Sequence, residues 1–279
     1  AGTVSGSTLT FGSSVRAYTG YPYEIKVAFD PSTANLFAVS YYAQPNNYAY
    51  VSIGTVSGSV VTLGTPVAFE STSVSDALVE FNPSTAGQLL VISTPNGSGT
   101  SGVRIGTVSG TSVSFGSVVG YLATGSNNPK LLFDPHTPNK FIITYQDKTT
   151  LYGLGIVGTI ASGTVSFGTV NTIVAFNTGT SAVPFVFDPL VANQFIIISQ
   201  QFDAAVSLLA VSLTLCTISG NTISVGTPSF ADYRGNREVR LFAEIENSTT
   251  RVTTVFVESS AATAYYIAVR VSHLQGTTF

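Results

Sequence analysis

Apolar and polar residues alternate along short stretches of the chain, as in β-strands whose two faces have different surroundings. Ile25, Val27 and Phe29 point to one face and the residues between them to the other, and residues 141–143 form a denser apolar run. No segment has a helical period, so the pattern predicts an all-β protein. In the first complete copy of the repeat described below we expect four strands, over about residues 24–30, 36–42, 48–55 and 60–69.

The phrase Gly-Thr-Val-Ser-Gly recurs along the chain at a constant spacing. It begins at Gly2, Gly54 and Gly106, and shorter versions begin at Gly158 and Cys216. A second phrase, Phe-Asp/Asn-Pro, recurs in the same register. Two markers with one period define tandem repeats, which cover approximately residues 2–53, 54–105, 106–157, 158–215 and 216–269, with 270–279 starting a further copy.

Each repeated phrase marks a turn. An Asp or Asn can accept hydrogen bonds from its own turn, and the following Pro fixes φ at the next position. Ser-Gly pairs such as Ser57-Gly58 turn the last hairpin, because Gly adopts positive φ without a steric cost. We interpret the first set as structural turn residues, with weak calcium binding at a few of them as the alternative. These residues are Asp30, Asn82, Asp134 and Asp188.

Four short strands in about 50 residues, repeated in tandem, are typical of a β-propeller blade. A single blade cannot bury both of its faces, so neighbouring blades stack. We therefore predict a single domain over residues 1–279, a β-propeller of about five four-stranded blades. Segments 2–11 and 270–279 occupy equivalent repeat positions, and a closed five-bladed ring has room for only one of them. We therefore expect one terminal segment to complete the last blade and close the ring by pairing of the N- and C-terminal parts of the chain. Which terminus closes the ring stays open, and an open β-solenoid or stacked sandwich is the alternative architecture.

The connections between the second and third strands vary from repeat to repeat, and they lie on one face, here called the loop face. The conserved-length turns lie on the opposite face. Aromatic residues interleaved with amides suit the recognition of a sugar or a protein surface, although ordinary polar loops would also explain them. The candidate binding residues of the loop face are Tyr41, Tyr42, Asn46, Asn47, Tyr48, Tyr145, Gln146, Asp147, Gln200, Gln201 and Asp203.

Composition excludes several classes of protein. The chain is 44% apolar and 9% charged, with a net charge of −3, which leaves too few Lys and Arg residues for a nucleic-acid groove. The longest weakly polar stretch, 204–216, is shorter than the ~20 residues that a membrane-spanning helix needs, so we expect no membrane insertion. One cysteine, Cys216, excludes an internal disulfide framework.

Candidate catalytic and metal-binding groups are few. His136 lies in an Asp-Pro turn and His273 lies near the end of the chain, and neither has the neighbours of a zinc site. No nucleophile-elbow motif accompanies the serines. We therefore expect no catalytic residue, no metal site and no cofactor, and a protein that is not an enzyme. Segments 96–98 and 247–249 match the N-glycosylation sequon, which is a common chance match.

The repeated phrases resemble tandem repeats in large tail or fibre proteins of tailed bacteriophages, especially cyanophages. Segments 29–34, 53–58 and 113–116 carry the resemblance, which extends over nearly the whole chain; the fifth repeat departs from it because it lacks Asp-Pro. The resemblance implies a structural component of a virion, or an extracellular protein, whose loop face contacts a host or other virion or filament subunits. Two alternatives are a carbohydrate-binding propeller that recognises a cell-surface glycan and a polysaccharide hydrolase.

Overall fold

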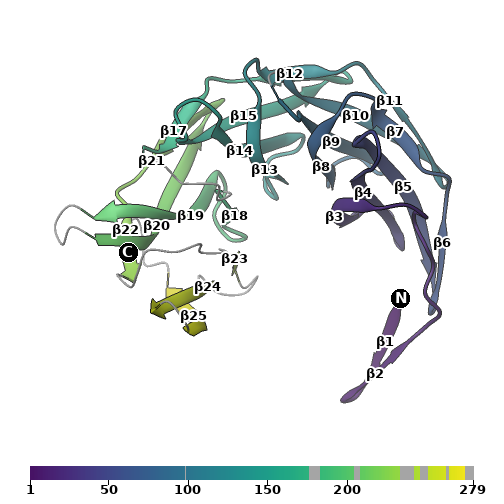
Figure 1. Ribbon diagram of the computed structural model, residues 1–279, viewed down its shortest axis with the longest axis horizontal. Helices are drawn as coiled ribbons and strands as arrows, with labels where there is room; N and C mark the ends of the chain where they lie inside the picture. The colour runs from purple at the N-terminus through teal and green to yellow at the C-terminus, as the bar shows by residue number, and fades with distance from the viewer. Residues whose placement is uncertain are drawn as a thin grey trace. The chain divides into compact units, whose positions relative to one another are not determined.

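The computed structural model describes residues 1–97, 99–175, 183–203, 208–232, 242–245, 251–261 and 264–273 (Figure 1). For residues 200–210, and from residue 231 onward, it describes the backbone of the strands only. Every regular element in these residues is a β-strand. In the described part of the chain no helix is long and apolar enough to span a membrane.

The first complete sheet contains the expected strands, with one difference. Its antiparallel strands follow the order β3-β4-β5-β6, and β7 also pairs with β5. The fourth strand, expected over 60–69 as one piece, is divided: β6 pairs with the end of β5 and β7 pairs with its beginning. The break contains Pro66, which has no N–H for the ladder, but the second and third sheets are divided at the same place without a proline. The bounds are β3 Pro22–Phe29, β4 Leu36–Ala43, β5 Tyr48–Ser57, β6 Val60–Leu63 and β7 Val67–Glu70.

The same arrangement recurs in the next three repeats, and the prediction of an all-β propeller built from four-stranded sheets is confirmed. The second sheet consists of β8 (Val74–Phe81), β9 (Gln88–Pro95), β10 (Ser101–Ser109), β11 (Ser112–Phe115) and β12 (Val119–Leu122). The third consists of β13 (Ser126–Phe133), β14 (Lys140–Asp147), β15 (Gly153–Ala161), β16 (Thr164–Phe167) and β17 (Asn171–Val174). The fourth consists of β18 (Phe185–Phe187), β19 (Gln194–Asp203), β20 (Leu208–Ser219), β21 (Thr222–Val225) and β22 (Ser229–Asp232).

The two ends of the chain form smaller sheets. The fifth repeat contributes a three-stranded sheet of β23 (Phe242–Ile245), β24 (Arg251–Ala261) and β25 (Ala264–His273). At the beginning of the chain, β1 (Gly2–Ser5) and β2 (Thr8–Phe11) form a two-stranded sheet of their own. Closure of a ring by the terminal segments therefore stays a prediction, and residues 274–279 lie outside the described residues.

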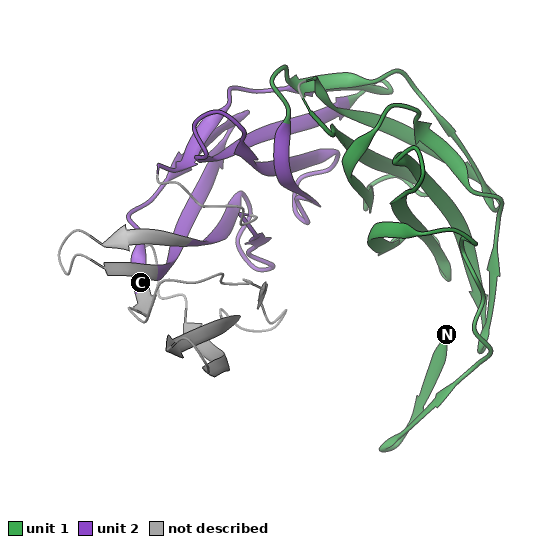
Figure 2. Ribbon diagram, in the orientation of Figure 1, with its two compact units in different colours: residues 1–125, 161–165 green, residues 126–160, 166–279 purple. Residues whose placement is uncertain are grey.

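The chain divides into two compact units (Figure 2). Unit 1 comprises residues 1–125 and 161–165, and unit 2 comprises residues 126–160 and 166–279. The single-domain boundary of 1–279 stays a prediction.

Each Asp/Asn-Pro turn ends at a residue with a left-handed backbone conformation. The carbonyl of this residue accepts a hydrogen bond from the third strand of its sheet, as in the 3.0 Å bond from Val56 N to Asn35 O. Gly and Asn tolerate positive φ better than other residues, which explains why only these two types occur here. The four residues and their φ angles are Asn35 (64°), Gly87 (68°), Asn139 (60°) and Asn193 (60°).

The core of unit 1 lies between its first two sheets. Ala28 of the first sheet and Phe81 of the second belong to one buried apolar cluster. Phe29, the repeat equivalent of Phe81, points to the opposite face of the first sheet from Ala28, because neighbouring side chains on a strand alternate. Phe29 is accordingly 61% exposed, whereas Phe81 is 1% exposed.

Unit 2 has a core of the same kind, formed by residues of the third and fourth sheets. One buried cluster joins Ile142 and Val157 of the third sheet to Phe187 and Phe195 of the fourth. The single cysteine, Cys216, belongs to this cluster. Burial raises the pKa of its thiol to about 12, so the thiol is neutral and unreactive at ordinary pH.

Candidate functional site

Three successive connections of unit 1 are joined by hydrogen bonds at its loop face. They are the β4–β5 connection (44–47), the β7–β8 connection (71–73) and the β9–β10 connection (96–100). The Val74 N–H donates to the Asn47 carbonyl at 2.9 Å, and the Asn96 N–H donates to the Ser73 carbonyl at 2.9 Å. These backbone bonds fix the position of each loop against the next.

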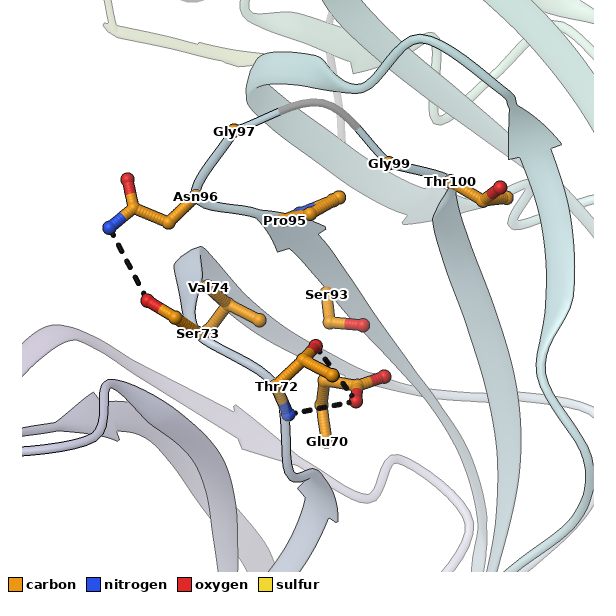
Figure 3. A pocket seen from close by; sticks show the side chains of 10 residues that line it. All are labelled: Glu70, Thr72, Ser73, Val74, Ser93, Pro95, Asn96, Gly97, Gly99 and Thr100. Atoms are coloured by element: carbon orange, nitrogen blue, oxygen red, sulfur yellow. Dashed lines mark hydrogen bonds between the residues drawn. The ribbon is translucent and has the colours of Figure 1, made fainter.

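A pocket of about 380 Å³ opens between the second and third of these connections (Figure 3). Glu70 and Thr72 line it from the β7 side, and Ser93, Asn96 and Thr100 line it from β9 and the connection to β10. The Asn96 amide also donates to the Ser73 hydroxyl at 3.4 Å. Hydroxyl and amide groups therefore make up most of its hydrogen-bonding wall.

The Glu70 carboxylate is held from both sides. Its Oε1 accepts hydrogen bonds from the backbone N–H groups of Ser71 and Thr72, at 3.0 and 3.1 Å, and from the Thr72 hydroxyl at 3.0 Å. Its Oε2 lies 3.5 Å from Nη2 of Arg104 in a half-buried ion pair. The negative charge of Glu70 is therefore compensated inside unit 1, and the pocket does not need a cationic ligand.

A second carboxylate, Asp76, lies near the beginning of β8 but does not line the pocket. Asp76 is buried, and its Oδ2 accepts hydrogen bonds from the hydroxyls of Ser75 (2.9 Å) and Thr94. The paired hydroxyls provide the hydrogen bonds that a buried carboxylate requires. Asp76 thus ties the beginning of β8 to the end of β9.

The tyrosines predicted to face a ligand in the first sheet occupy two different environments. Tyr41 is 1% exposed and packs against the rings of Tyr18 and Tyr50, with centroids at 5.2 and 5.8 Å. Burial raises the pKa of Tyr41. Tyr42 is half-buried and stacks on Tyr23 at 5.4 Å. The placement of Tyr41 on an accessible surface is therefore corrected, because in a propeller sheet both faces can be buried.

The other predicted residues of the first sheet lie in or beside the β4–β5 connection. Asn46 is exposed, whereas Asn47 and Tyr48 are half-buried. Asn47 has a φ of 54°, and its carbonyl forms the bond to Val74 described above. Asn47 thus has a structural role in ordering the loop face, which leaves Asn46 as the freely accessible side chain of these three.

The predicted binding residues of the third sheet hold their own connection together. Tyr145 and Gln146 are both fully buried, and the Gln146 Nε2 donates to the Leu151 carbonyl at 3.4 Å. Asp147 Oδ1 accepts hydrogen bonds from the N–H groups of Thr149 and Thr150, at 3.0 and 2.6 Å. Burial alone would raise the pKa of Asp147, but these bonds lower it overall. The placement of Tyr145, Gln146 and Asp147 as ligand-facing residues is therefore corrected.

The remaining predicted residues belong to the fourth sheet. The backbones of Gln200, Gln201 and Asp203 lie in β19 and pair with β20. Their side chains lie outside the described residues, so their proposed contribution to binding stays a prediction.

The four turn residues are buried and accept hydrogen bonds from their own turns. Oδ1 of each accepts a backbone N–H two residues later, in the pairs Asp30–Ser32 (2.8 Å), Asn82–Ser84 (3.0 Å), Asp134–His136 (2.9 Å) and Asp188–Leu190 (2.8 Å). Among the described residues no group of three or more His, Cys, Asp or Glu side chains could hold a metal ion. His136 itself spans two sheets of unit 2, with Nε2 at 3.1 Å from the Asp188 carbonyl.

Sequence reasoning missed the ion pair between Glu70 and Arg104, which are 34 residues apart. A signal was present in the repeat. At the equivalent positions of the following repeat, Leu122 replaces Glu70 and Ile156 replaces Arg104. Neither position is apolar in every repeat, since Asp232 is an equivalent of Glu70, and Ser52 and Thr214 are equivalents of Arg104. The signal is therefore only the opposite charge of Glu70 and Arg104.

Comparison with known proteins identifies the fold and no family. No protein-family model matches the chain, and no curated protein sequence matches it. Among solved structures, a protein from Lactobacillus plantarum is similar over 94% of this chain and 74% of its own, with 10% identity and a TM-score of 0.56.

Two further solved structures are similar to this chain over most of its length. One is an endo-arabinase from Bacteroides thetaiotaomicron, similar over 94% of this chain and 98% of its own, with 10% identity and a TM-score of 0.40. The other is a lectin from Aleuria aurantia in complex with α-methyl-L-fucoside, similar over 93% and 98%, with 11% identity and a TM-score of 0.41. At these identities the likeness concerns the fold alone.

The expectation of a protein that is not an enzyme is corrected by this comparison. The expectation depended on the scarcity of ionisable side chains in a repeat, and the solved structures similar to this chain include an endo-arabinase. A fold by itself excludes no activity, so the chemistry has to be argued from side chains at a site.

Proposed function

We propose that the loop face of unit 1 binds a neutral, hydroxyl-rich ligand, which makes this chain a glycan-binding β-propeller. The observation that carries the proposal is the pocket beside Glu70, whose wall offers hydroxyl and amide groups and whose acid is already paired with Arg104. Its volume of about 380 Å³ is in the range of small-molecule sites.

The chemistry of the wall favours sugar hydroxyls over charged groups. A sugar hydroxyl both donates and accepts hydrogen bonds, and so do the side chains of Thr72, Ser93 and Thr100. A cationic ligand would compete with Arg104 for the Glu70 carboxylate, and an anionic ligand would meet that carboxylate without a free cation among the lining residues. The pocket therefore supports a neutral polar ligand best.

A glycan array followed by calorimetric titration tests the proposal. We expect Asn96→Ala and Thr100→Ala each to weaken binding about tenfold, which is ~1.4 kcal/mol and the usual scale of one lost hydrogen bond. Thr85→Ala is the matched control, because Thr85 is exposed in the β8–β9 turn at the opposite end of the same sheet. Binding to no glycan, or binding that neither pocket variant weakens, would refute the proposal.

The same glycans also test for hydrolysis. Glycoside hydrolysis commonly uses two carboxyl groups. Two are close in the sequence here, because Glu70 is the last residue of β7 and Asp76 lies near the beginning of β8. Release of new reducing ends from a bound glycan, lost in Glu70→Gln, would extend the proposal from binding to catalysis.

The resemblance of the repeats to phage tail and fibre repeats supports a further proposal about where the module acts. We place it on a virion or another extracellular structure, next to other subunits of that structure. Mass spectrometry of purified particles tests this location. Absence of the protein from purified particles would refute this location and would leave the proposal of glycan binding unaffected.

A further inference from the structure

The β9–β10 connection contains the one Asn-Gly pair of the 279-residue sequence, Asn96-Gly97. Asn96 lines the pocket, and both residues lie outside the flanking strands β9 and β10 (Figure 3). We infer that Asn96 is a site of spontaneous deamidation, and that this modification places a second carboxylate in the pocket.

The reaction needs only water as a co-reactant. The backbone nitrogen of Gly97 attacks Cγ of Asn96, so that an N–Cγ bond forms while the Cγ–Nδ2 bond breaks. The proton lost by the Gly97 nitrogen leaves with Nδ2 as ammonia. Water then opens the cyclic succinimide at either of its carbonyls, which gives aspartate or isoaspartate at position 96.

The surroundings of the pair permit this attack. Asn96 is exposed to solvent, which supplies the water and accepts the ammonia. Apart from atoms of Gly97 and its two chain neighbours, no heavy atom lies within 4 Å of the place where a Cβ on Gly97 would be, so the space beside its Cα is open. Glycine also lacks the Cβ that hinders ring closure and has the widest choice of backbone angles.

The structure predicts what the modification changes. A carboxylate at position 96 would share the pocket with Glu70, and only one of the two acids is paired with Arg104. Isoaspartate would also lengthen the backbone beside the 2.9 Å bond from Asn96 N to Ser73 O. Loss of that bond would separate the β9–β10 connection from the β7–β8 connection.

Incubation of the purified chain in ¹⁸O-labelled water, followed by peptide mass spectrometry, tests the inference. We expect label to accumulate at position 96 faster than at Asn46, which is also exposed but precedes Asn47 instead of glycine. The rate should rise with pH, because the attacking nitrogen must lose its proton. An Asn96 that stays intact in the folded chain while it deamidates in urea would overturn the inference.

Gly97→Ala is the matched variant. The open space around Gly97 and its ordinary φ should let the alanine variant fold. We expect deamidation at least about tenfold slower in this variant, an increase of about 1.4 kcal/mol in the activation free energy. An unchanged rate would overturn the inference, and the comparison with Asn46 in the unaltered chain does not depend on the variant.

The effect on the ligand, unlike the modification, depends on the proposed function. We expect Asn96→Asp, and the deamidated fraction isolated by ion exchange, to bind the glycan at least tenfold more weakly than the intact chain, because a neutral ligand would have to desolvate an added charge. Deamidation with unchanged glycan binding would refute the pocket as the ligand site and leave the modification established.

Discussion

The backbone N–H of Gly87 donates a 2.8 Å hydrogen bond to Oδ2 of Asp30, a buried carboxylate 57 residues earlier on the preceding sheet of unit 1. Oδ1 of Asp30 accepts the Ser32 N–H of its own turn at 2.8 Å. Gly87 is the positive-φ residue that ends the next turn. One carboxylate thus orders its own turn and also joins it to the following repeat.

We expect Asp30→Ala to lower the free energy of unfolding by about 2–3 kcal/mol, because it leaves the N–H groups of Ser32 and Gly87 without their charged acceptor. Asp30→Asn should cost less, since its carbonyl can still accept the Ser32 N–H. Ser84→Ala, an exposed side chain in the equivalent turn of the second sheet, should change stability by less than about 0.5 kcal/mol. Urea unfolding measures all three, and an Asp30→Ala variant as stable as the control would contradict the bridging role.

Gly106 provides space for the side chain of Leu89 on the neighbouring strand. A Cβ on Gly106 would lie 2.5 Å from Leu89 Cδ1 and 2.9 Å from a ring carbon of Phe115. We expect Gly106→Ala to destabilise the chain by about 1–3 kcal/mol through overpacking. Gly116→Ala should be nearly neutral, because the nearest atom to its added Cβ would be 3.8 Å away.

Leu89→Ala supplies a second arm for the same prediction. Alone it should cost about 2–5 kcal/mol, because Leu89 is fully buried. Combined with Gly106→Ala it should cost less than the sum of the two, since the added methyl group enters the space that the leucine leaves. Additive costs in the double-mutant cycle would show that the two side chains do not compete for this space.

Phe133 of unit 2 is buried, and its ring centroid lies 5.6 Å from that of Phe141. We expect Phe133→Ala to cost about 3–5 kcal/mol in chemical denaturation. Val170→Ala, at a more exposed position of the same unit, is the control. A loss below about 1 kcal/mol for Phe133→Ala would mean that this ring is not part of the core.

Glu80 gives the chain a pH-dependent stability. Burial raises the pKa of Glu80 to about 7, above the value near ~4.3 expected when the chain is unfolded. Because the native state holds this proton more tightly, stability should fall as pH rises from about 4 to about 7, by on the order of 2 kcal/mol. Glu80→Gln should flatten the profile of unfolding free energy against pH. Parallel profiles for the two proteins would contradict the burial of an ionisable carboxyl group.

Ring closure is tested by deleting residues 1–11. The sheet of the fifth repeat has three strands in the described part of the chain, and β2 corresponds in the repeat to β6, part of a fourth strand. If the beginning of the chain completes that sheet, its deletion should cost more than about 2 kcal/mol of stability. Deletion of residues 274–279 is the comparison. A loss of stability in this deletion alone would assign closure to the C-terminal segment. Unchanged stability in both deletions would contradict closure.

The repeated phrases determined the positions of most strands and turns. The Phe-Asp/Asn-Pro phrase marks the end of the first strand, and Ser-Gly pairs mark the last hairpin, because these features depend on local backbone geometry. The division of the fourth strand was harder to predict from the sequence. Pro66 was present to indicate it, but the apolar residues on both sides of this proline continue the strand pattern.

The sequence by itself determined the all-β class, the period and the turn chemistry, since each follows from neighbouring residues. Only the tertiary structure decided which side chains are accessible. Tyr41 and Tyr145 are of a residue type that is common at binding surfaces, yet both are buried. The ion pair of Glu70 with Arg104 likewise depends on packing between residues 34 apart. Burial and long-range pairing are set by how one sheet lies against another, and a strand buried on both faces carries no alternation that reveals it.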